Sequence, residues 1–419
     1  MQYIIFQLVF FCALLYFVFK HNKSGVSKLV LIEWTVSSVF TYVYTILVLE
    51  GYLTFNFLPV LYWDLCFLIY LFPLLGIKIE DINVSNKFVD VSIKVLTILG
   101  ILSILPLVEN LFHLISNYAS QSSAIVEMYE DKMDVDNKAN LITWLSPLGM
   151  YLHNLVAKFT FPGLVLLFII ATKKEYIPTS RLVVILCLYV NTISFALNNS
   201  GRGTVVEFFL ITFAFFILFR EKIILNIPRT LRLSVLSVVG GIIACMVILT
   251  MLRSGGDEAD TFDTWAGISL YLGEGQVNFF ENMWESKTST LGDYSFSYVK
   301  DLFGFETFQN YLDRRDYWNE SRVGYDPVRF YTFIGGWFSD LRHFTILFVI
   351  IISFLFLKML RRSNGVFTPL SLYAIYIYID IILMGFAFFN FMVYAKFRQA
   401  VVAFIYLFVL YHFTKAKKD

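Results

Sequence analysis

Long apolar segments separated by polar connections recur along the chain. Most approach the length of about 20 residues with which a helix crosses about 30 Å of hydrocarbon. The pattern therefore predicts an all-α polytopic membrane protein with about 11 transmembrane helices. The predicted spans are residues 3–19, 29–49, 58–75, 91–115, 146–172, 182–197, 203–219, 233–252, 344–357, 366–385 and 400–413.

Composition excludes an ordinary soluble domain, because 58% of the residues are apolar, 18% are aromatic and the mean hydropathy is +0.68. The net charge of +1 gives no basis for a nucleic-acid partner. The four cysteines all lie in apolar segments, so neither disulfides nor a thiolate metal site is expected. The first segment lacks a basic start and a small-residue cleavage site, which predicts a retained helix.

The charges between the apolar segments indicate their orientation. With the N-terminus outside and the C-terminus cytoplasmic, the lysine and arginine clusters all face the cytoplasm, as the positive-inside rule requires. The predicted domains are transmembrane residues 1–253, an external loop of short helices at 254–342, and transmembrane residues 343–419. The clusters are Lys20/Lys23/Lys28, Lys78/Lys87, Lys173/Lys174, Arg220/Lys222/Arg229/Arg232, Lys358/Arg361/Arg362 and Lys415/Lys417/Lys418.

A polar decapeptide, residues 198–207, interrupts the apolar sequence between two predicted spans. Ser200 is a good N-cap residue, and Gly201 and Gly203 let the backbone approach a ligand closely. The following helix would point its unpaired N–H groups toward Arg202, and such a helix start attracts phosphate. The alternative is a tight helical hairpin in which Arg202 merely reaches lipid headgroups.

Ionisable residues inside the apolar segments are costly and usually face the protein interior. Glu207 lies one helical turn from Gly203, so it shares a helix face with the predicted phosphate site and is expected to pair with Arg202. Asp64 and Asp380 are further acids at predicted membrane depth.

The predicted external loop, residues 254–342, is rich in tryptophan, tyrosine and acids. Flat rings beside carboxylates suit sugar faces, although the same rings could pin a lid at the membrane interface. The loop and its border also carry guanidinium groups that could bind phosphate. These arginines are Arg253, Arg314, Arg315, Arg322, Arg329 and Arg342.

A pair of acids in the polar segment 116–140, Asp134 and Asp136, has the spacing of a divalent-ion site. In so acidic a segment such pairs arise by chance. The expectation is therefore a protein without a metal site and without a cofactor.

Two stretches carry a resemblance to a known family. The chain has Asn199-Ser200-Gly201-Arg202-Gly203 opening a helix, a long late external loop, and the segment 325–340 with Tyr331-Thr332 and Asp340 leading into the next span. Together these features resemble the Wzy-type repeat-unit polymerases of O-antigen and capsule synthesis. The chain departs from the family pattern at Leu341-Arg342, where Phe-Gly is usual.

The resemblance implies glycosyl transfer on the outer face of the bacterial cytoplasmic membrane. A growing glycan leaves its polyprenyl pyrophosphate and joins a newly flipped, lipid-linked repeat unit. The implied partners are this lipid-linked oligosaccharide, membrane lipid, a chain-length-regulating co-polymerase and a flippase.

The resemblance also gives roles to residues of this chain. Arg202 is the first candidate for the departing pyrophosphate, supported by Ser200, Gly201, Gly203 and Glu207. Further cations follow in the order Arg253, Arg329 and Arg342. Asp340 or Glu274 would orient the acceptor hydroxyl, with His343 as another proton carrier. Asp340 could instead pair with Arg342 or cap the helix that follows.

Two other functions stay open. A lipid-linked oligosaccharide flippase or other transporter would also be polytopic with buried charges, but would be expected to show internal repeats, and none stands out here. An O-antigen ligase, which transfers the glycan to lipid A core, has similar helices and normally features a loop histidine. His343 is the histidine in or beside the loop of this chain.

Overall fold

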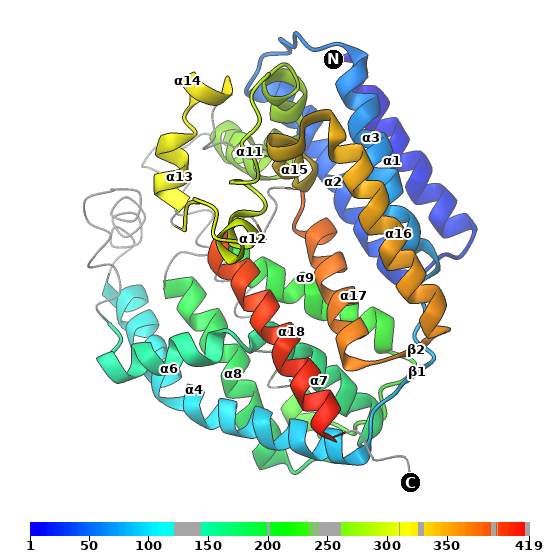
Figure 1. Ribbon diagram of the computed structural model, residues 1–419. Helices are drawn as coiled ribbons and strands as arrows, with labels where there is room; N and C mark the ends of the chain where they lie inside the picture. Colours follow the sequence, from blue (N-terminus) through cyan, green and yellow to red (C-terminus); the bar gives the residue numbers. More distant parts are fainter. Residues whose placement is uncertain are drawn as a thin grey trace. The chain divides into compact units, whose positions relative to one another are not determined.

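The computed structural model is mainly helical over the part of the chain that it describes (Figure 1). Two short strands, β1 (Asp81–Ile82) and β2 (Val366–Phe367), pair with each other. The predicted all-α class is thus confirmed for the part of the chain that is described. That part comprises residues 1–120, 144–198, 202–233, 235, 237, 240, 261–309, 311–325, 331–386, 391 and 393–414.

The helices follow the predicted apolar segments closely, and short helices fill the predicted loop. Before the loop lie α1 (Gln2–Lys20), α2 (Gly25–Leu47), α3 (Phe57–Leu71), η1 (Phe72–Gly76), α4 (Asn86–Ser120), α6 (Pro147–Ala157), α7 (Thr160–Lys173), α8 (Thr179–Asn198) and α9 (Arg202–Phe219). After them come α11 (Thr261–Asn278), η3 (Phe279–Met283), α12 (Ser297–Leu302), α13 (Tyr311–Tyr317), α14 (Glu320–Val323), α15 (Phe333–Leu341), η4 (Arg342–Phe344), α16 (Thr345–Ser363), α17 (Pro369–Leu383) and α18 (Tyr394–Thr414).

Within the described residues, 7 helices are long and apolar enough to cross a membrane, or 8 if the bent pair α6 and α7 counts as one span. The predicted number, about 11, was higher because it included α9 and α17, which are apolar but shorter. It also included residues 233–252, most of which lie outside the described residues. The predicted orientation stays a prediction.

The break between α6 and α7 has a local cause. The sequence predicts one span here, yet the two helices meet at an angle of 55°. Pro162 has no N–H to donate to the carbonyl of Lys158, and its ring would clash with that carbonyl in a continuous helix. The helix therefore ends at Ala157 and restarts at Thr160.

The chain divides into two compact units, each built from separated parts of the sequence. From Ala259 onward, the loop that the sequence predicts as an external domain belongs to the same unit as the first three helices. Unit 1 comprises Met1–Asp81, Ala259–Phe367 and Ala374–Phe404, and unit 2 comprises Ile82–Glu258, Thr368–Tyr373 and Ile405–Asp419.

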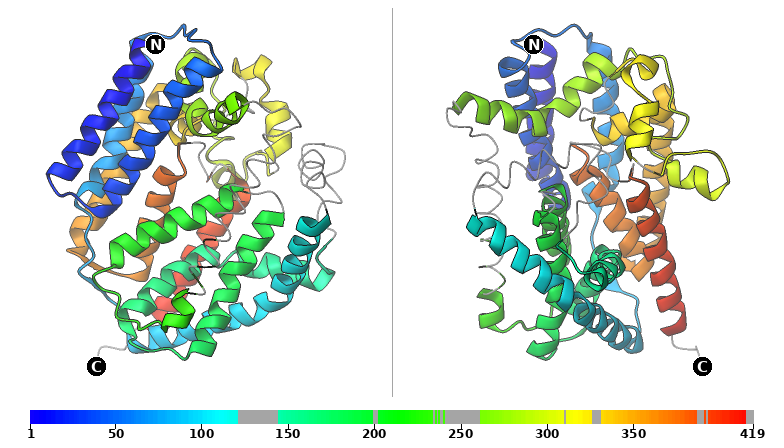
Figure 2. Two further views of the ribbon diagram at one scale, coloured as in Figure 1. Left: turned by 180° about the vertical axis from the view of Figure 1, so that it is seen from behind. Right: turned by 90° about the vertical axis from the view of Figure 1, so that its left-hand side faces the viewer.

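Unit 1 has an aromatic core. Its helices α1, α2, α3 and α16 lie alongside one another (Figure 2). Trp34 and Trp63 are fully buried, with ring centroids 5.1 Å apart. Both indole N–H groups have acceptors, since Trp34 donates to the carbonyl of Ile382 at 2.9 Å and Trp63 donates to Thr332 Oγ1 at 2.9 Å. The second bond ties the end of the predicted loop to α3.

Helix α11, from the predicted loop, packs tightly on α2 within the same unit. A Cβ atom added to Gly273 would lie only 2.4 Å from the backbone of Phe40, so the two helix backbones approach closely. Ser37 Oγ donates to the carbonyl of Leu272 at 2.7 Å, and Thr41 Oγ1 donates to that of Gly273 at 3.3 Å. This part of the loop is therefore an integral part of unit 1.

Unit 2 is built around α4 and α8. A Cβ atom added to Gly100 on α4 would lie 2.1 Å from the carbonyl oxygen of Val184 on α8, so only glycine permits this crossing. Helix α7 is buried over most of its length and contacts α9 through Phe168, whose ring lies 5.6 Å from that of Phe215. This packing holds the helix that begins at Arg202.

Candidate functional site

The predicted phosphate site lies at the start of a helix, as the sequence indicates. Helix α8 ends at Asn198 and α9 begins at Arg202. A Cβ atom added to Gly203 would meet no atom within 4 Å, so space is open beside the first turn. Ser200, Gly201 and the side chain of Arg202 lie outside the described residues, so their predicted roles stay predictions.

Glu207 lies in the second turn of α9 and is 5% exposed. Its neighbour on the helix, Val205, is completely buried, whereas Gly203 and Thr204 are exposed. A carboxyl group enclosed in this way is expected to have a partner. The burial of Glu207 is consistent with its predicted role in support of the helix start.

A buried polar network fixes the end of α8 in unit 2, and the sequence analysis did not single it out. Asn198 Nδ2 donates to the carbonyl of Asn110 at 2.9 Å, and Asn110 Nδ2 donates to Asn191 Oδ1 at 3.0 Å. Trp144 Nε1 donates to Asn110 Oδ1 at 2.9 Å. Asn191 Nδ2 lies 3.3 Å from His153 Nδ1. We call the side chains of Asn110, Trp144, His153, Asn191 and Asn198 the asparagine network.

The asparagine network includes Asn198, the last residue of α8, and α9 begins four residues later at Arg202. Asn110 and Asn191 are completely buried and Asn198 is 2% exposed, so the network depends on its internal hydrogen bonds. Asn191 lies inside an apolar segment and Asn198 follows its end seven positions later, on the same helix face, which is the signal that could have revealed the network. The network positions the C-terminal end of α8, four residues before Arg202.

In unit 1, the predicted catalytic acid Asp340 is enclosed by donors. Its carboxylate accepts from the hydroxyl of Thr290 and from the backbone N–H groups of Gly292 at 2.9 Å, Tyr294 at 3.1 Å and Ser295 at 2.6 Å. The side chain is 6% exposed. These bonds anchor the turn at residues 290–295 and occupy the oxygens that a general base would use. The anticipated alternatives, an ion pair with Arg342 or a cap on the next helix, are not among these contacts.

Arg342, a predicted phosphate ligand, holds the end of η3. Its Nη2 donates to the carbonyls of Met283 at 3.2 Å and Ser286, and its guanidinium lies 4.3 Å from the centre of the Phe338 ring. Nη1 is buried and has no hydrogen-bond partner in the described part of the chain. A phosphate could contact Nη1 only after a rearrangement, so the geometry assigns Arg342 mainly to the packing of the loop.

The other two predicted proton carriers differ in exposure. Glu274 lies on α11 between Gly273 and Gly275 and is 5% exposed. His343 lies at the break between α15 and α16 and is exposed, with its ring 4.7 Å from that of Trp284. Its carbonyl accepts from the hydroxyl of Tyr62 at 3.0 Å. Of the three candidates, His343 is the one whose side chain a substrate could reach without rearrangement.

Most rings near the end of the predicted sugar-binding loop lie inside unit 1. Trp337 and Tyr325 are 1% and 2% exposed, and the Tyr325 hydroxyl donates to Ser339 Oγ at 2.9 Å. Burial raises the pKa of Tyr325 to about 12, so this phenol stays protonated. The more accessible rings are Trp265 and Tyr271 on α11, at 53% and 45% exposed, and Tyr317. Any sugar stacking would therefore use this earlier part of the loop.

One further cation of the loop, Arg314, is buried. Its Nη1 donates to the carbonyl of Tyr294 at 3.2 Å, and its guanidinium lies 4.4 Å from the centre of that ring. Arg314 thereby supports the same turn as Asp340. The remaining predicted residues, Arg253, Arg329, Asp134 and Asp136, lie outside the described residues.

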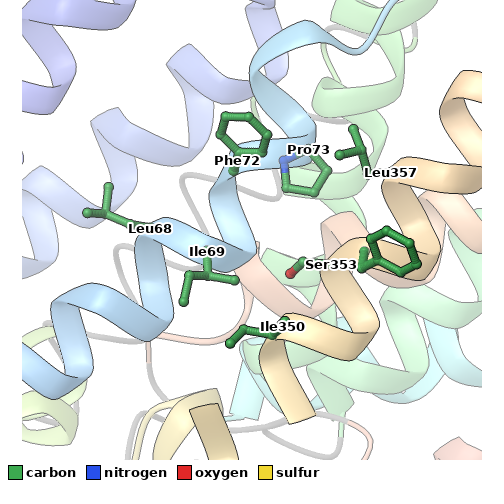
Figure 3. Close-up of a pocket in the computed structure, with 8 residues that line it drawn as sticks. Leu68, Ile69, Phe72, Pro73, Ile350, Ser353 and Leu357 are labelled. Atoms are coloured by element: carbon green, nitrogen blue, oxygen red, sulfur yellow. The ribbon is translucent and has the colours of Figure 1, made fainter. Parts of the chain in front are cut away.

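An apolar groove of about 350 Å³ runs between the end of α3 and the middle of α16 in unit 1 (Figure 3). Its one hydroxyl, on Ser353, lies 3.2 Å from the hydroxyl of Tyr378 and is thus already paired. Such a lining suits a hydrocarbon chain. The lining residues are Leu68, Ile69, Phe72, Pro73, Ile350, Ser353, Phe354 and Leu357.

The apolar helices of the described residues define a multi-pass membrane protein. Comparison of the chain with protein families, with curated proteins and with solved structures gives no match. Any assignment of a more specific function therefore rests on the residues described above.

Proposed function

We propose that this protein polymerises polyprenyl-pyrophosphate-linked oligosaccharide repeat units by glycosyl transfer at the outer face of the bacterial cytoplasmic membrane. The observation that carries the proposal is the start of α9 at Arg202, between two apolar helices and followed by the buried Glu207. The resemblance of residues 199–203 and 325–340 to the repeat-unit polymerases supports it. The product would be O-antigen or capsular polysaccharide.

Charge develops on the pyrophosphate as the glycosidic bond to the lipid carrier breaks. The first N–H groups of α9 have no partners within the helix and carry the positive end of its dipole. A guanidinium at the first helical position adds two parallel donors that match phosphate oxygens. Arg202 and the helix start would together stabilise the leaving group without a metal ion.

The acceptor hydroxyl must lose a proton as the new bond forms. We assign this step to His343, because its side chain is exposed while the oxygens of Asp340 are occupied by donors. Asp340 then serves as the anchor of the turn at residues 290–295. The apolar groove between α3 and α16 offers a surface for a lipid tail.

An exposed histidine beside the loop also fits an O-antigen ligase, and buried charges fit a flippase. The three functions differ in what accumulates when the gene is deleted. Loss of a polymerase leaves core capped with single repeats, loss of a ligase leaves uncapped core, and loss of a flippase leaves no repeats outside. Profiling the polysaccharide of a deletion strain therefore separates them.

The same strain tests the site by complementation with two matched variants. Arg202→Lys keeps the charge but loses the bidentate fork, so it should leave single repeats although the protein still reaches the membrane. Arg220→Lys is the control, because Arg220 follows the other end of α9 and its side chain is 64% exposed. Normal polymer from both variants would remove Arg202 from the site.

A further inference from the structure

A glutamine and an acid face each other at membrane depth in unit 1. Gln7 lies on α1 and Asp64 near the middle of the predicted span formed by α3 and η1. Gln7 Nε2 donates to Asp64 Oδ1 at 3.4 Å, and the two residues are 0% and 4% exposed. Neither residue has a part in the proposed transfer reaction.

The other two polar atoms of this pair lack partners. Gln7 Oε1 and Asp64 Oδ2 are buried and make no hydrogen bond in the described part of the chain. Both are acceptors when Asp64 is ionised, so each would be left without a donor. An ionised carboxylate with one long hydrogen bond is strongly disfavoured in such surroundings.

The described residues supply no ion pair that would compensate for a charge on Asp64. Among the described residues, no lysine, arginine or histidine forms an ion pair with Asp64. The residues beside it on the adjoining faces of α1 and α3 include the buried rings of Phe11, Trp63 and Phe67. The titratable groups nearest in sequence, Tyr62 and Cys66, contact each other, and the Tyr62 hydroxyl bonds to the backbone of residues 343 and 346.

Asp380 shows the contrasting arrangement in the same unit. Its side chain is completely buried, and its Oδ2 lies 3.3 Å from Lys396 Nζ. A cation beside a buried acid favours its ionised form. Asp64 faces the amide of Gln7 instead of a cation. An amide can donate a hydrogen bond to one oxygen of a neutral carboxylic acid and accept one from its O–H group.

We propose that Asp64 is a proton-binding site, occupied in the folded protein, and that the neutral acid and Gln7 form a reciprocal pair. A single proton on Oδ2 converts that atom into a donor to Gln7 Oε1, while Gln7 Nε2 continues to donate to Oδ1. The proton comes from water as the helices pack. One proton thus satisfies both unpaired atoms and fastens α1 to α3.

Infrared spectroscopy of the purified full chain in lipid tests this proposal directly, because a protonated carboxyl group has its own carbonyl stretching band. Asp64→Asn should remove one such band, and its amide can still pair with Gln7, so the variant should fold. Asp380→Asn is the matched control and should leave that band in place. A spectrum of Asp64→Asn that keeps all protonated-carboxyl absorption would overturn the proposal.

Gln7→Leu tests the pairing separately from the protonation. It removes the acceptor for the acid proton, so the Asp64 band should remain but shift in frequency. An unshifted band would show that the acid is not bonded to Gln7. These results do not depend on the transfer activity, so they stand apart from the proposed function.

Discussion

The hydroxyl of Thr290 donates to the carboxylate of Asp340, a residue 50 positions later in the chain. With the N–H groups of Gly292, Tyr294 and Ser295, it makes Asp340 the acceptor around which one turn of the loop is built. Such a buried, multiply bonded carboxylate contributes mainly to stability. The same residue would be expected to be accessible if it were the catalytic base.

Asp340→Asn should therefore destabilise the protein. An amide places an N–H₂ group against N–H donors, and a lost hydrogen bond to a charged group costs about 1.5–3 kcal/mol. Thermal unfolding in detergent measures the effect, with the exposed Asp313→Asn as control. Unchanged stability together with lost polymer would instead restore Asp340 as the base.

Gly273→Val should weaken the packing of α11 on α2. The new side chain would begin 2.4 Å from the backbone of Phe40, and overpacking of this kind typically costs about 1–3 kcal/mol. Gly267→Val is the matched control on the same helix, because a Cβ atom there meets nothing within 4 Å. The melting temperature should fall for the first variant and stay near that of the wild type for the second. Equal melting temperatures would contradict the close approach of the two helices.

Asn110→Leu should disrupt the asparagine network and disturb the start of α9. The change removes the acceptor of Trp144 Nε1 and the donor to Asn191 Oδ1, at a cost of about 1–3 kcal/mol for a buried unsatisfied group. Asn198 keeps its hydrogen bond to the backbone carbonyl of residue 110. Ser103→Ala is the control, because among the described residues its hydroxyl bonds within α4, to the carbonyl of Leu99. Loss of polymer and a lower melting temperature are expected together. A stable, fully active Asn110→Leu variant would show that the network does not position the site.

Activity should survive removal of divalent metal ions. The proposed site neutralises pyrophosphate with a guanidinium and helix N–H groups, so no ion is needed for the leaving group. Polymer formation in washed membranes should be the same with and without EDTA. Loss of activity in EDTA that magnesium or manganese restores would point back to Asp134 and Asp136.

The positions of most helices could be predicted from the sequence because apolar length and flanking charges are local signals. The beginning of α9 at Arg202 and the C-terminal ends of α1 and α18 lie close to the predicted bounds. The predicted number of spans was less reliable, since α9 and α17 are short and Pro162 breaks one segment in two.

Contacts between distant residues could not be predicted in the same way. Nothing around Gly273 indicates that its partner is Phe40, and the donors to Asp340 come from a turn that precedes it by 45 to 50 residues. From the sequence, Trp337 belongs to a loop whose aromatic rings suit stacking on sugars. In the structure its ring is buried in unit 1. The asparagine network had a detectable signal, because polar side chains inside apolar segments usually face one another.

Labelling at Gly203 tests the central claim most directly, since a side chain fits there without contact. In a variant that lacks the native cysteines, Gly203→Cys should react with a membrane-impermeant thiol reagent added to spheroplasts with an intact cytoplasmic membrane. Polyprenyl pyrophosphate should slow this reaction, and Arg202→Lys in the same chain should abolish the protection. Reaction only after the membrane is permeabilised, or a rate unaffected by polyprenyl pyrophosphate, would contradict a diphosphate site at the start of α9 on the outer face.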